Sequence, residues 1–395
     1  MDEHKRRKKI GVIGTGFIAR GFTLAMADQP DLEVSRVLTR RDPKTCKDFP
    51  RRDLLTNSAT ELIDHADVIV ECCGDVVHAT NVIDAALKGG LPVVTMDSEW
   101  HVTVGSYYTD KGLVTEAEGD QPGVLAALRE DMLQMGFQPL VYGNIKGFYN
   151  PDPQEDEMRY WAKKQGLSLT MVTAATDGTK VQFEQALVAN GFAASMLKEG
   201  FSAPKVKDVH QSAQELAAWA KQHGRAISDY VICANFPARV FIAAEHSQAQ
   251  QAALEYLKLG KGPYYVLYHN TTLCHLEIVK TVRRVLNGGG VLLNNSASPR
   301  VSMAALAKKD LKPGATIAFA CGSFELRGQA VAINNHAGHV PIALLNNAVL
   351  RRSVARDQII EWDDVDVPDS LAVQAWKELE KKMLAQKEKT DDALR

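Results

Sequence analysis

Short apolar runs alternate with helix-like segments along the first third of the chain. The run KKIGVI at residues 8–13 turns apolar after two lysines and ends before Gly14, as a short buried strand does. From Phe17 the apolar positions adopt helical spacing. The same reasoning predicts later strands within residues 34–38, 67–75, 91–99 and 112–123, and helices within residues 59–66, 78–90 and 123–135. Buried strands that alternate with helices predict an α/β fold with a Rossmann-type, doubly wound parallel sheet.

The alternation becomes irregular after about residue 140, which indicates a change of domain. We expect an NAD(P)-binding domain over residues 1–140 and an α+β catalytic and dimerisation domain over residues 141–290. The glycine run at the end of that range precedes short strands separated by turns, which predict a small β-rich domain over residues 291–370. Residues 371–395 are polar and charged, and we expect a frayed terminal helix there.

The first strand leads into the pattern Gly-x-Gly-x-x-Ala, which opens the first helix. Gly14 permits a tight turn, Gly16 lets the backbone approach a pyrophosphate, and the small Ala19 lets the helix pack close to the strand. Free N–H groups and the helix dipole supply positive potential there. Glycine turns also occur for packing alone, but in the first β-α-β unit the motif predicts a dinucleotide site. Its residues are Gly14, Thr15, Gly16, Phe17, Ile18 and Ala19.

The second strand is followed by Thr39, Arg40 and Arg41, where NAD-binding proteins place an acid that binds the ribose hydroxyls. A carboxylate would repel a 2′-phosphate, whereas guanidinium groups bind it through charge-assisted hydrogen bonds. These residues therefore favour NADP as the cofactor, with NAD as an alternative. The competing interpretation is a solvated basic loop, because arginines are common on surfaces.

Ligands of such sheets bind at the carboxyl ends of the strands, which places Cys73, Gly74 and Glu99 along the cofactor cleft. Glu99, Glu118 and Asp120 could also bind a divalent cation if they converge, since hard cations take clustered carboxylates. Nothing in the linear spacing requires a metal, so a metal site stays open at this stage.

An enzyme that transfers hydride needs a proton donor or acceptor near the reacting oxygen. Lys146 is our first candidate, because it lies in a predicted glycine-bounded turn within VYGNIKGFYNP, where an ammonium can polarise a carbonyl. Asp177 and Lys180 follow LTMVTAAT, residues 169–176, which we predict as a strand. These two side chains could share a substrate hydroxyl or form a solvated turn.

Two further candidates lie later in the chain. Lys261 has glycine on both sides, which suggests close ligand approach, and its charge suits a phosphate or a carboxylate. His269 ends a predicted strand and is the better histidine candidate, because His275 lies in an otherwise apolar helix and is expected to pack in the core. Lys308 and Lys309, in the turn AKKDLKPG, are expected to lie in a solvated loop.

Composition limits the classes of partner. The chain has 395 residues and a formal net charge of −2, which gives no electrostatic case for binding nucleic acid or an anionic membrane. We find no run of 18 apolar residues, no secretory h-region and no C-x-x-C pair among the six cysteines. The sequence therefore predicts a cytoplasmic protein with reduced cysteines, a small-molecule substrate and a homo-oligomeric state.

Five stretches, VVTMDSEWHVTVG, EGDQPG, GNIKG, LGKGPYY and AKKDLKPG, resemble in order and spacing those of bacterial DXR-like (DRL) oxidoreductases. These are distant relatives of homoserine dehydrogenase that carry a C-terminal SAF domain, and the resemblance runs from Lys8 to about Val367. It implies NADP dependence, chemistry on CH–OH groups and a SAF-like third domain with a structural or oligomeric role. One branch of that family converts 1-deoxyxylulose 5-phosphate to methylerythritol 4-phosphate, and many members have no assigned substrate.

Three functional hypotheses follow. The first is an NADP-dependent oxidoreductase, or oxidoreductase-isomerase, acting on a small polyhydroxylated or phosphorylated carbon compound. It is favoured because Lys146, Lys180 and Lys261 supply more positive charge than an amino-acid substrate needs. The second is homoserine-dehydrogenase-like oxidation of an amino-alcohol. The third is a non-catalytic NADP-binding sensor, which would keep its function without Lys146.

Overall fold

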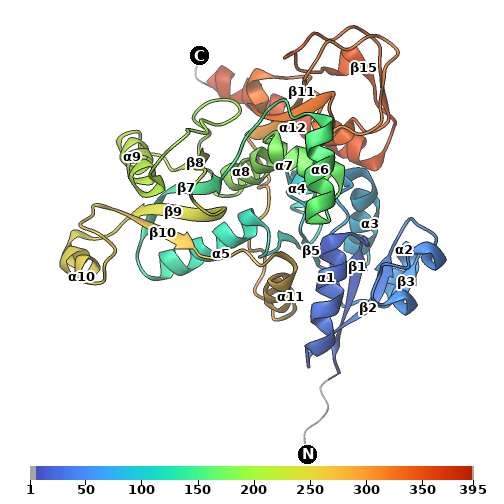
Figure 1. The fold of residues 1–395 in the computed structure, drawn as a ribbon, viewed down its shortest axis with the longest axis horizontal. Helices are drawn as coiled ribbons and strands as arrows, with labels where there is room; N and C mark the ends of the chain where they lie inside the picture. Colours follow the sequence, from blue (N-terminus) through green and yellow to red (C-terminus); the bar gives the residue numbers. More distant parts are fainter. Residues whose placement is uncertain (1–5, 394–395) are drawn as a thin grey trace, which may run out of the picture.

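The computed structural model describes residues 6–393, with side chains described through residue 385. Its first part is a six-stranded sheet with the order β3-β2-β1-β4-β5-β6, in which every neighbouring pair is parallel. The strands are β1 (Lys8–Ile13), β2 (Leu32–Leu38), β3 (Leu55–Thr56), β4 (Val68–Glu71), β5 (Val93–Thr95) and β6 (Val114–Glu116). This order confirms the predicted Rossmann-type sheet (Figure 1).

Helices cover both faces of this sheet, because successive residues of its central strands are buried. Ile10 and Val12 of β1 share a core with α1 (Phe17–Ala25) and α11 (Ile278–Leu286), whereas Ile13 belongs to the core on the other face. That second face carries α2 (Ala59–Asp64), α3 (Val76–Lys88) and α4 (Ser98–Val104). Because α11 comes late in the sequence, the chain returns to the first sheet after building the second.

The second sheet has the order β10-β9-β7-β8 and forms the left part of the view in Figure 1. Its strands are β7 (Gln138–Lys146), β8 (Ile227–Ile232), β9 (Arg239–Glu245) and β10 (Tyr264–His269). One face packs on α5 (Gln121–Gln134) and α8 (Thr179–Gly191), and the other packs on α9 (Val209–Gln222). A short helix, α10 (Gln251–Tyr256), connects β9 to β10.

The prediction of a turn at VYGNIKGFYNP is wrong, because β7 continues through Gly143 to Lys146. A Cβ atom on Gly143 would lie 2.1 Å from Cζ of Phe241 on the neighbouring strand, so this glycine makes room for a ring inside the sheet. The predicted strand LTMVTAAT is likewise wrong: it is α7 (Leu169–Thr176), capped by the Ser168 hydroxyl, which accepts a hydrogen bond from Met171 N at 3.2 Å.

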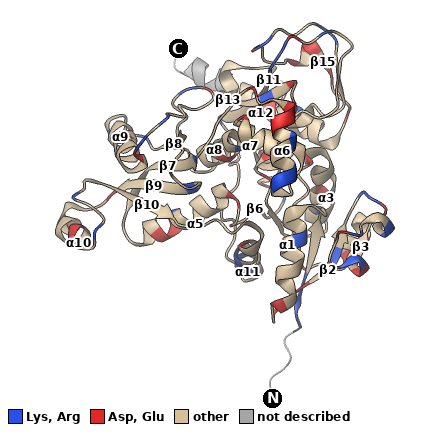
Figure 2. Cartoon of the chain, in the orientation of Figure 1, with Lys and Arg blue, Asp and Glu red and all other residues tan. Residues whose placement is uncertain are grey.

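The helix before α7 is α6 (Glu155–Gln165), which begins with three acids and ends with two lysines. Figure 2 shows these charges as red and blue ends of the helix, the arrangement that the helix dipole favours.

Residues 301–366 form two small antiparallel sheets that we call the C-terminal β module. One pairs β11 (Val301–Ala307) with β13 (Leu326–Ala332), and the other contains β12 (Thr316–Ile317), β14 (Ala348–Leu350) and β15 (Val365–Asp366). Strands β11 and β13 pack on α8. These extra sheets agree with the β-rich region expected from the sequence.

The chain ends in α12 (Leu371–Ala393), and residues 394–395 of the predicted tail lie outside the described residues. This helix packs on α3 and α4 and buries Trp376, so its first half belongs to the core. Within the part of the chain that the structure describes, no helix combines the length and apolar character needed to cross a membrane.

Candidate active site

The glycine turn after β1 has the shape that a dinucleotide needs. Gly14 has φ +109°, and a Cβ there would lie 2.9 Å from the carbonyl oxygen of Cys72, so only glycine fits. A Cβ on Gly16 would meet no atom within 4 Å, and no side chain caps α1, which begins at Phe17. Open space and the helix N-terminus therefore coincide above Gly16, and the residues present fit a pyrophosphate.

The structure brings the residues at the end of β2 to this turn. Arg41 Nη2 donates to the Thr15 hydroxyl at 3.2 Å, and the hydroxyl oxygens of Thr15 and Thr39 are 3.4 Å apart. Arg40 is largely exposed and lies 2.7 Å from a carboxylate oxygen of Asp75 at the start of α3. The Arg41 guanidinium therefore borders the turn, and the Arg40 guanidinium lies at the start of α3.

Cys73 and Gly74 follow β4 on the same side of the sheet. Gly74 has φ +63° and no neighbour within 4 Å of a Cβ placed on it, so this backbone is also open to a ligand. Burial raises the pKa of the Cys73 thiol well above its ordinary value, so the thiol is neutral. Six cysteines of the chain are free thiols.

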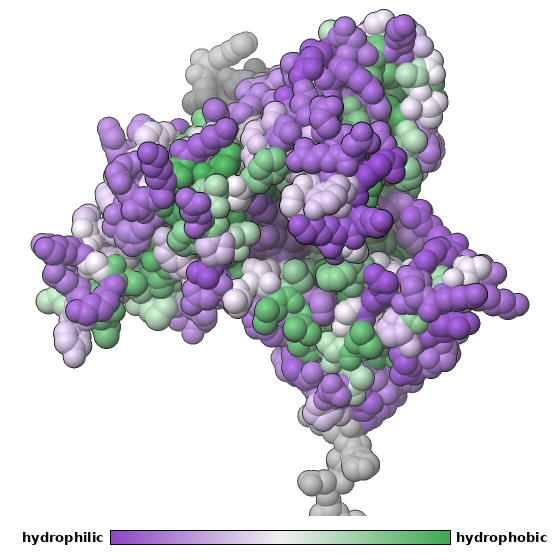
Figure 3. Space-filling view, viewed as in Figure 1, coloured by the Kyte–Doolittle hydropathy of each residue, from purple (hydrophilic) through white to green (hydrophobic). Residues whose placement is uncertain are grey.

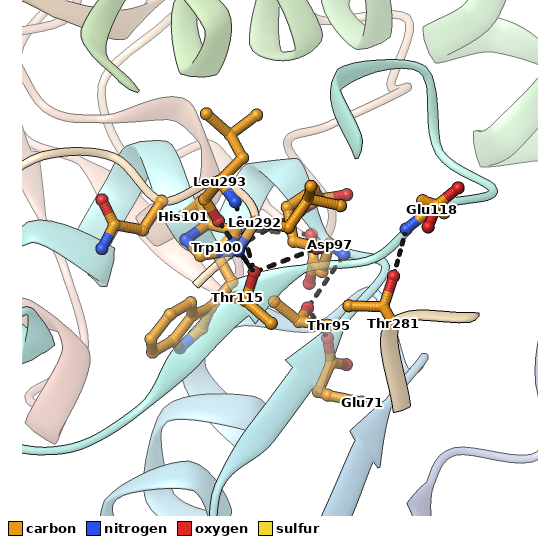
Figure 4. A network of polar contacts seen from close by, with 12 residues as sticks. Glu71, Thr95, Asp97, Trp100, His101, Thr115, Glu118, Thr281, Leu292 and Leu293 are labelled. Atoms are coloured by element: carbon orange, nitrogen blue, oxygen red, sulfur yellow. Dashed lines mark hydrogen bonds and ion pairs between the residues drawn. The ribbon is translucent and has the colours of Figure 1, made fainter. Parts of the chain in front are cut away.

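Buried acids line the carboxyl ends of β4, β5 and β6 (Figure 4). Glu71 accepts hydrogen bonds from the Thr95 hydroxyl and from Cys73 N, each at 2.6 Å, and Thr95 in turn accepts from Asp97 N at 2.9 Å. Burial raises the pKa values of Glu71, Asp97 and Glu116. These side chains therefore hold protons more readily than ordinary carboxyls.

His101 and Glu116 lie beside this network, with His101 Nε2 3.6 Å from Glu116 Oε2. Burial lowers the pKa of His101 to about 3, so the imidazole is neutral at physiological pH. Glu99, on the first turn of α4, is only partly buried. Its charge adds to the effects of burial and of Glu184 in raising the pKa of Asp120.

Opposite these acids lies a group that we call the lysine cluster: Asp120, Asn144, Lys146, Lys180 and Glu184. Lys146 ends β7 and its Nζ lies 3.2 Å from Oε2 of Glu184. Lys180, in the first turn of α8, lies 3.3 Å from Oε1 of the same carboxylate and 3.4 Å from Oδ1 of Asp120. Glu184 is fully buried, whereas the Lys146 and Lys180 side chains are 19% and 33% exposed.

Two amides complete the contacts of Glu184. Asn144 Nδ2 donates to Oε2 at 2.9 Å. The Gln121 amide, turned so that both of its polar atoms are satisfied, donates to Glu184 Oε1 at 2.9 Å and to Asp120 Oδ1 at 3.1 Å. Each oxygen of Glu184 is thus shared between an ammonium and an amide.

Opposing effects set the protonation of the cluster. Burial raises the pKa of Asp120 to about 6, although Lys180 acts in the other direction. Burial disfavours the Lys180 ammonium, but Asp120 and Glu184 outweigh it and raise its pKa well above the ordinary value. Burial also disfavours the Glu184 carboxylate, yet Lys146 and Lys180 lower its pKa overall. At neutral pH the charged Lys180 ammonium therefore lies beside the charged Glu184 carboxylate.

Sequence reasoning selected Lys146 and Lys180 and missed Glu184, Asn144 and Gln121. Two signals were present. Glu184 follows Lys180 by four residues on a helix, and Asn144 precedes Lys146 by two on a strand, so each pair lies on one face of its element.

Asp177 does not join Lys180, which corrects the expectation of a shared substrate hydroxyl or a solvated turn. The Asp177 carboxylate is fully buried, and its Oδ2 lies 2.7 Å from Nζ of Lys308. Lys308 is therefore not in a solvated loop, whereas its neighbour Lys309 is exposed and pairs with Glu325. Sequence alone could not reveal this pair, because 131 residues separate its members.

Lys261 lies at the wrong end of the second sheet. Tyr264 pairs with Glu245, which pairs with Gln138 at the start of β7, eight residues before Lys146. At ~3.3 Å per residue the two lysines are separated by roughly 25 Å along the sheet. Lys261 is exposed there, and its carbonyl oxygen accepts from Gln251 Nε2 at 2.8 Å.

His269 does end β10, at the same end of the sheet as Lys146. It lies two strands from β7, about 10 Å away by strand spacing. No hydrogen bond or ion pair among the described side chains joins it to the lysine cluster. His275 packs edge-on against Phe17 with ring centroids 5.8 Å apart, beside the glycine turn.

Two of the three carboxylates that might have converged on a cation are paired with lysines instead. Glu118 contacts Lys280, and Asp120 contacts Lys180. Within the described residues, no group of three or more His, Cys, Asp or Glu side chains is placed to hold a metal ion.

Figure 3 shows a largely hydrophilic surface that is hollowed between the part built on the first sheet and the part built on the second. Residues 14–102, which carry the glycine turn, match the model of the homoserine dehydrogenase NAD-binding domain. Residues 119–278, which carry the lysine cluster, match the model of the oxidoreductase DRL catalytic domain.

Curated relatives cover less of the chain. It is 30% identical over 136 residues to meso-diaminopimelate D-dehydrogenase of Ureibacillus thermosphaericus, a match of 34% of this chain and 38% of that protein. It is 34% identical over 67 residues to the same enzyme of Lysinibacillus sphaericus, covering 17% and 21% of the two chains. The chain therefore spans well under half the length of these relatives.

Among solved structures, a homoserine dehydrogenase from Thiobacillus denitrificans aligns with a TM-score of 0.48 and 15% identity, covering 78% of this chain and 84% of that one. The family assignment rests on the two family models and not on this alignment. They support an NAD(P)-binding oxidoreductase of the DRL and homoserine dehydrogenase-like kind.

Proposed function

We propose that the protein transfers hydride between a nicotinamide cofactor and a carbinol or carbonyl carbon held at the lysine cluster. The observation that carries this proposal is the position of Lys146 and Lys180. Both ammonium groups share Glu184 and both remain partly exposed. Lys146 ends β7, and Lys180, on α8, contacts Asp120, which follows β6 of the nucleotide-binding part. A substrate oxygen between them would meet two donors at hydrogen-bonding distance.

Bound NAD(P) supplies or accepts the hydride. When a carbonyl is reduced, the Lys146 ammonium donates a proton to the developing alkoxide and becomes a neutral amine; in the reverse direction the neutral amine accepts the proton of the alcohol. Glu184 holds that ammonium in place through Oε2, and Asn144 fixes the carboxylate. Lys180 stabilises the same oxygen electrostatically, because its contacts with Asp120 and Glu184 keep it charged.

NADP is our proposed cofactor, because Arg41 contacts the glycine turn and Asp75, the acid at the start of α3, is already paired with Arg40. Guanidinium groups bind a 2′-phosphate more strongly than they bind ribose hydroxyls. We further propose that the C-terminal β module is SAF-like and that the protein works as a homo-oligomer in the cytoplasm.

Charge balance narrows the substrate class. Two lysines in the cluster face Glu184 and Asp120, Glu99 contributes a further acid, and Lys261 is absent from this end of the sheet. The site therefore lacks the excess of positive charge that a phosphate would require. A small polyhydroxylated compound fits best, with several hydroxyls to meet both carboxylates and ammonium groups; an isomerisation before reduction is compatible with the same contacts.

Amino-alcohol oxidation of the homoserine dehydrogenase kind is the second candidate. The observation that favours it is the acidic surroundings of Lys180, since Asp120 and Glu99 would attract a substrate ammonium. The two candidates therefore differ in the charge of the substrate rather than in the chemistry of hydride transfer.

A deuterium-transfer assay tests these alternatives. The protein is incubated with NADPH deuterated at either face of C4 and with three panels: neutral sugars and ketones of polyols, sugar phosphates, and amino-acid semialdehydes. Mass spectrometry then detects deuterium in the product. We expect transfer to the neutral polyhydroxylated panel. Transfer only to sugar phosphates would overturn the charge argument, transfer only to semialdehydes would establish the second candidate, and transfer to none would favour a non-catalytic sensor.

A further inference from the structure

Lys308 of the C-terminal β module is buried against the segment that precedes α8. Its Nζ lies 2.7 Å from Asp177 Oδ2 and donates to the Ser323 carbonyl oxygen at 2.6 Å. The other oxygen of Asp177 accepts from Thr179 N, the first residue of α8, at 2.9 Å. One carboxylate thus joins the lysine of the module to the beginning of the helix.

Two more hydrogen bonds attach the module to the first turns of α8. Gly328 N donates to the Thr179 hydroxyl, and Ala330 N donates to Gln182 Oε1, each at 2.8 Å. Both donors are backbone groups of β13 and both bonds are buried. The strand therefore fixes the rotation of the helix as well as its starting point.

Lys180 and Glu184 lie on the same helix and are one turn apart, so they share one face. That face carries the lysine cluster, whereas Asp177, Thr179 and Gln182 contact the module. Because a helix moves as a rigid element over one turn, a shift of its start would move both cluster side chains together.

We propose that Lys308 is a positioning residue: through Asp177 and the first turn of α8, it holds Lys180 and Glu184 in the arrangement of the lysine cluster. The module is then a working part of the site. It also packs against α4, the helix whose first turn carries Glu99, through β11. The importance of this positioning for turnover rests on the proposed function, but the positioning itself can be measured without a substrate.

The side chain of Asp120 reports on the position of Lys180, which lies 3.4 Å from it. Its other charged or titratable neighbours come from several elements and are Glu99, Glu116, Lys146, Glu184 and Cys274. The experiment follows the 13C signal of the Asp120 carboxyl during a pH titration of the full chain labelled at aspartate. Asp120→Asn identifies the signal, and Lys180→Met gives the effect of losing the ammonium completely.

Removing a nearby opposite charge raises a carboxyl pKa by about 1 unit or more, which we expect for Lys180→Met. Lys308→Met should raise the Asp120 pKa in the same direction by at least about a third of that shift. Lys309→Met is the matched control, because Lys309 is adjacent but exposed and paired only with Glu325. It should leave the titration unchanged.

Lys308→Met leaves the Asp177 carboxylate buried without its ammonium, so Lys308→Met/Asp177→Asn is tested in parallel. The double variant removes both charges and should fold with the same shift of Asp120. A wild-type titration in either folded variant would overturn the proposal, and so would failure of both to fold, since Lys308 would then serve only the fold.

Turnover provides the second readout. With any substrate that the deuterium assay identifies, the double variant should lose kcat about 10-fold while the Kd for NADPH stays at the wild-type value. If the wild-type protein transfers no deuterium, the proposed function fails, and the Asp120 titration still decides whether Lys308 positions the cluster.

Discussion

Two sets of lysines and carboxylates lie at the start of α8, and they differ in how completely they are closed. Lys308 and Asp177 form a one-to-one pair in which both side chains are almost wholly buried and their remaining atoms are occupied by Ser323 O and Thr179 N. In the lysine cluster, Glu184 is shared by two ammonium groups that both reach solvent.

This difference distinguishes an ion pair that stabilises the fold from a cluster that can act on a substrate. A closed pair offers no exposed donor to a ligand, and its role is to hold two parts of the chain together. An open cluster leaves ammonium protons for a substrate oxygen, and its shared carboxylate lets the two lysines respond to each other. Burial of a charge is therefore informative only together with the number of its partners.

Breaking the closed pair should have the largest effect on stability. Lys308→Met strands a buried carboxylate, and removing one partner of a buried ion pair costs about 3–5 kcal/mol in the free energy of unfolding. Lys309→Met removes an exposed pair and should cost less than about 0.5 kcal/mol. Urea unfolding of both variants checks this, and equal losses would show that the Lys308 pair is not closed.

The exposed side chains of Arg40 and Arg41 extend the comparison to cofactor binding. Arg40 is 63% exposed, so its contact with Asp75 is expected to contribute little to folding. Replacing Arg40 and Arg41 by Ala should instead weaken NADPH binding by about 1–3 kcal/mol and leave NADH binding nearly unchanged. Fluorescence titrations with both nucleotides test this. Equal weakening of NADPH and NADH would contradict the assignment of these arginines to a 2′-phosphate.

The lysine cluster should also make the free energy of unfolding depend on pH, in the direction opposite to that of a carboxyl whose pKa is lowered by folding. The pKa of Asp120 is raised to about 6 in the folded protein, above the ~3.9 of an unfolded aspartate. The native state therefore binds more protons in this range, so the contribution of Asp120 to stability is full below about pH 4 and is lost as the pH rises through about 6.

The slope from this single group cannot exceed about 1.4 kcal/mol per pH unit. Urea unfolding between about pH 4 and 7 measures it as the difference between the wild-type protein and Asp120→Asn. A difference that stays constant, or that changes in favour of the wild type as the pH rises, would mean that the raised pKa is wrong.

Local sequence patterns were sufficient for the nucleotide-binding part. Gly14 needs a positive φ, which is a property of the turn itself, so the Gly-x-Gly-x-x-Ala pattern was enough to predict the turn. Local patterns failed at Gly143. Glycine is needed there because a Cβ atom would collide with the ring of Phe241, which is about a hundred residues away in the chain. A glycine can mark a turn or a tight contact inside a sheet, and only the partner strand distinguishes them.

Only part of the lysine cluster was predicted, because the contact that joins its residues is also distant in sequence. Lys146 and Lys180 were identified from their surroundings in sequence, but Glu184, which joins them, became visible only when β7 and α8 were placed together. Lys261 shows the opposite error. Its flanking glycines resemble those of a ligand loop, yet the pairing of β10 places it at the far end of the sheet.

The measurement that tests the account most directly is the rate of deuterium transfer from deuterated NADPH in Lys146→Met, with Lys261→Met as the matched control on the same sheet. Methionine keeps the length of the side chain and removes the ammonium. We predict that Lys146→Met binds NADPH as the wild-type protein does but transfers deuterium at least about 100-fold more slowly, whereas Lys261→Met transfers at the wild-type rate. Wild-type transfer in a folded Lys146→Met protein would contradict the central claim that the lysine cluster performs the chemistry.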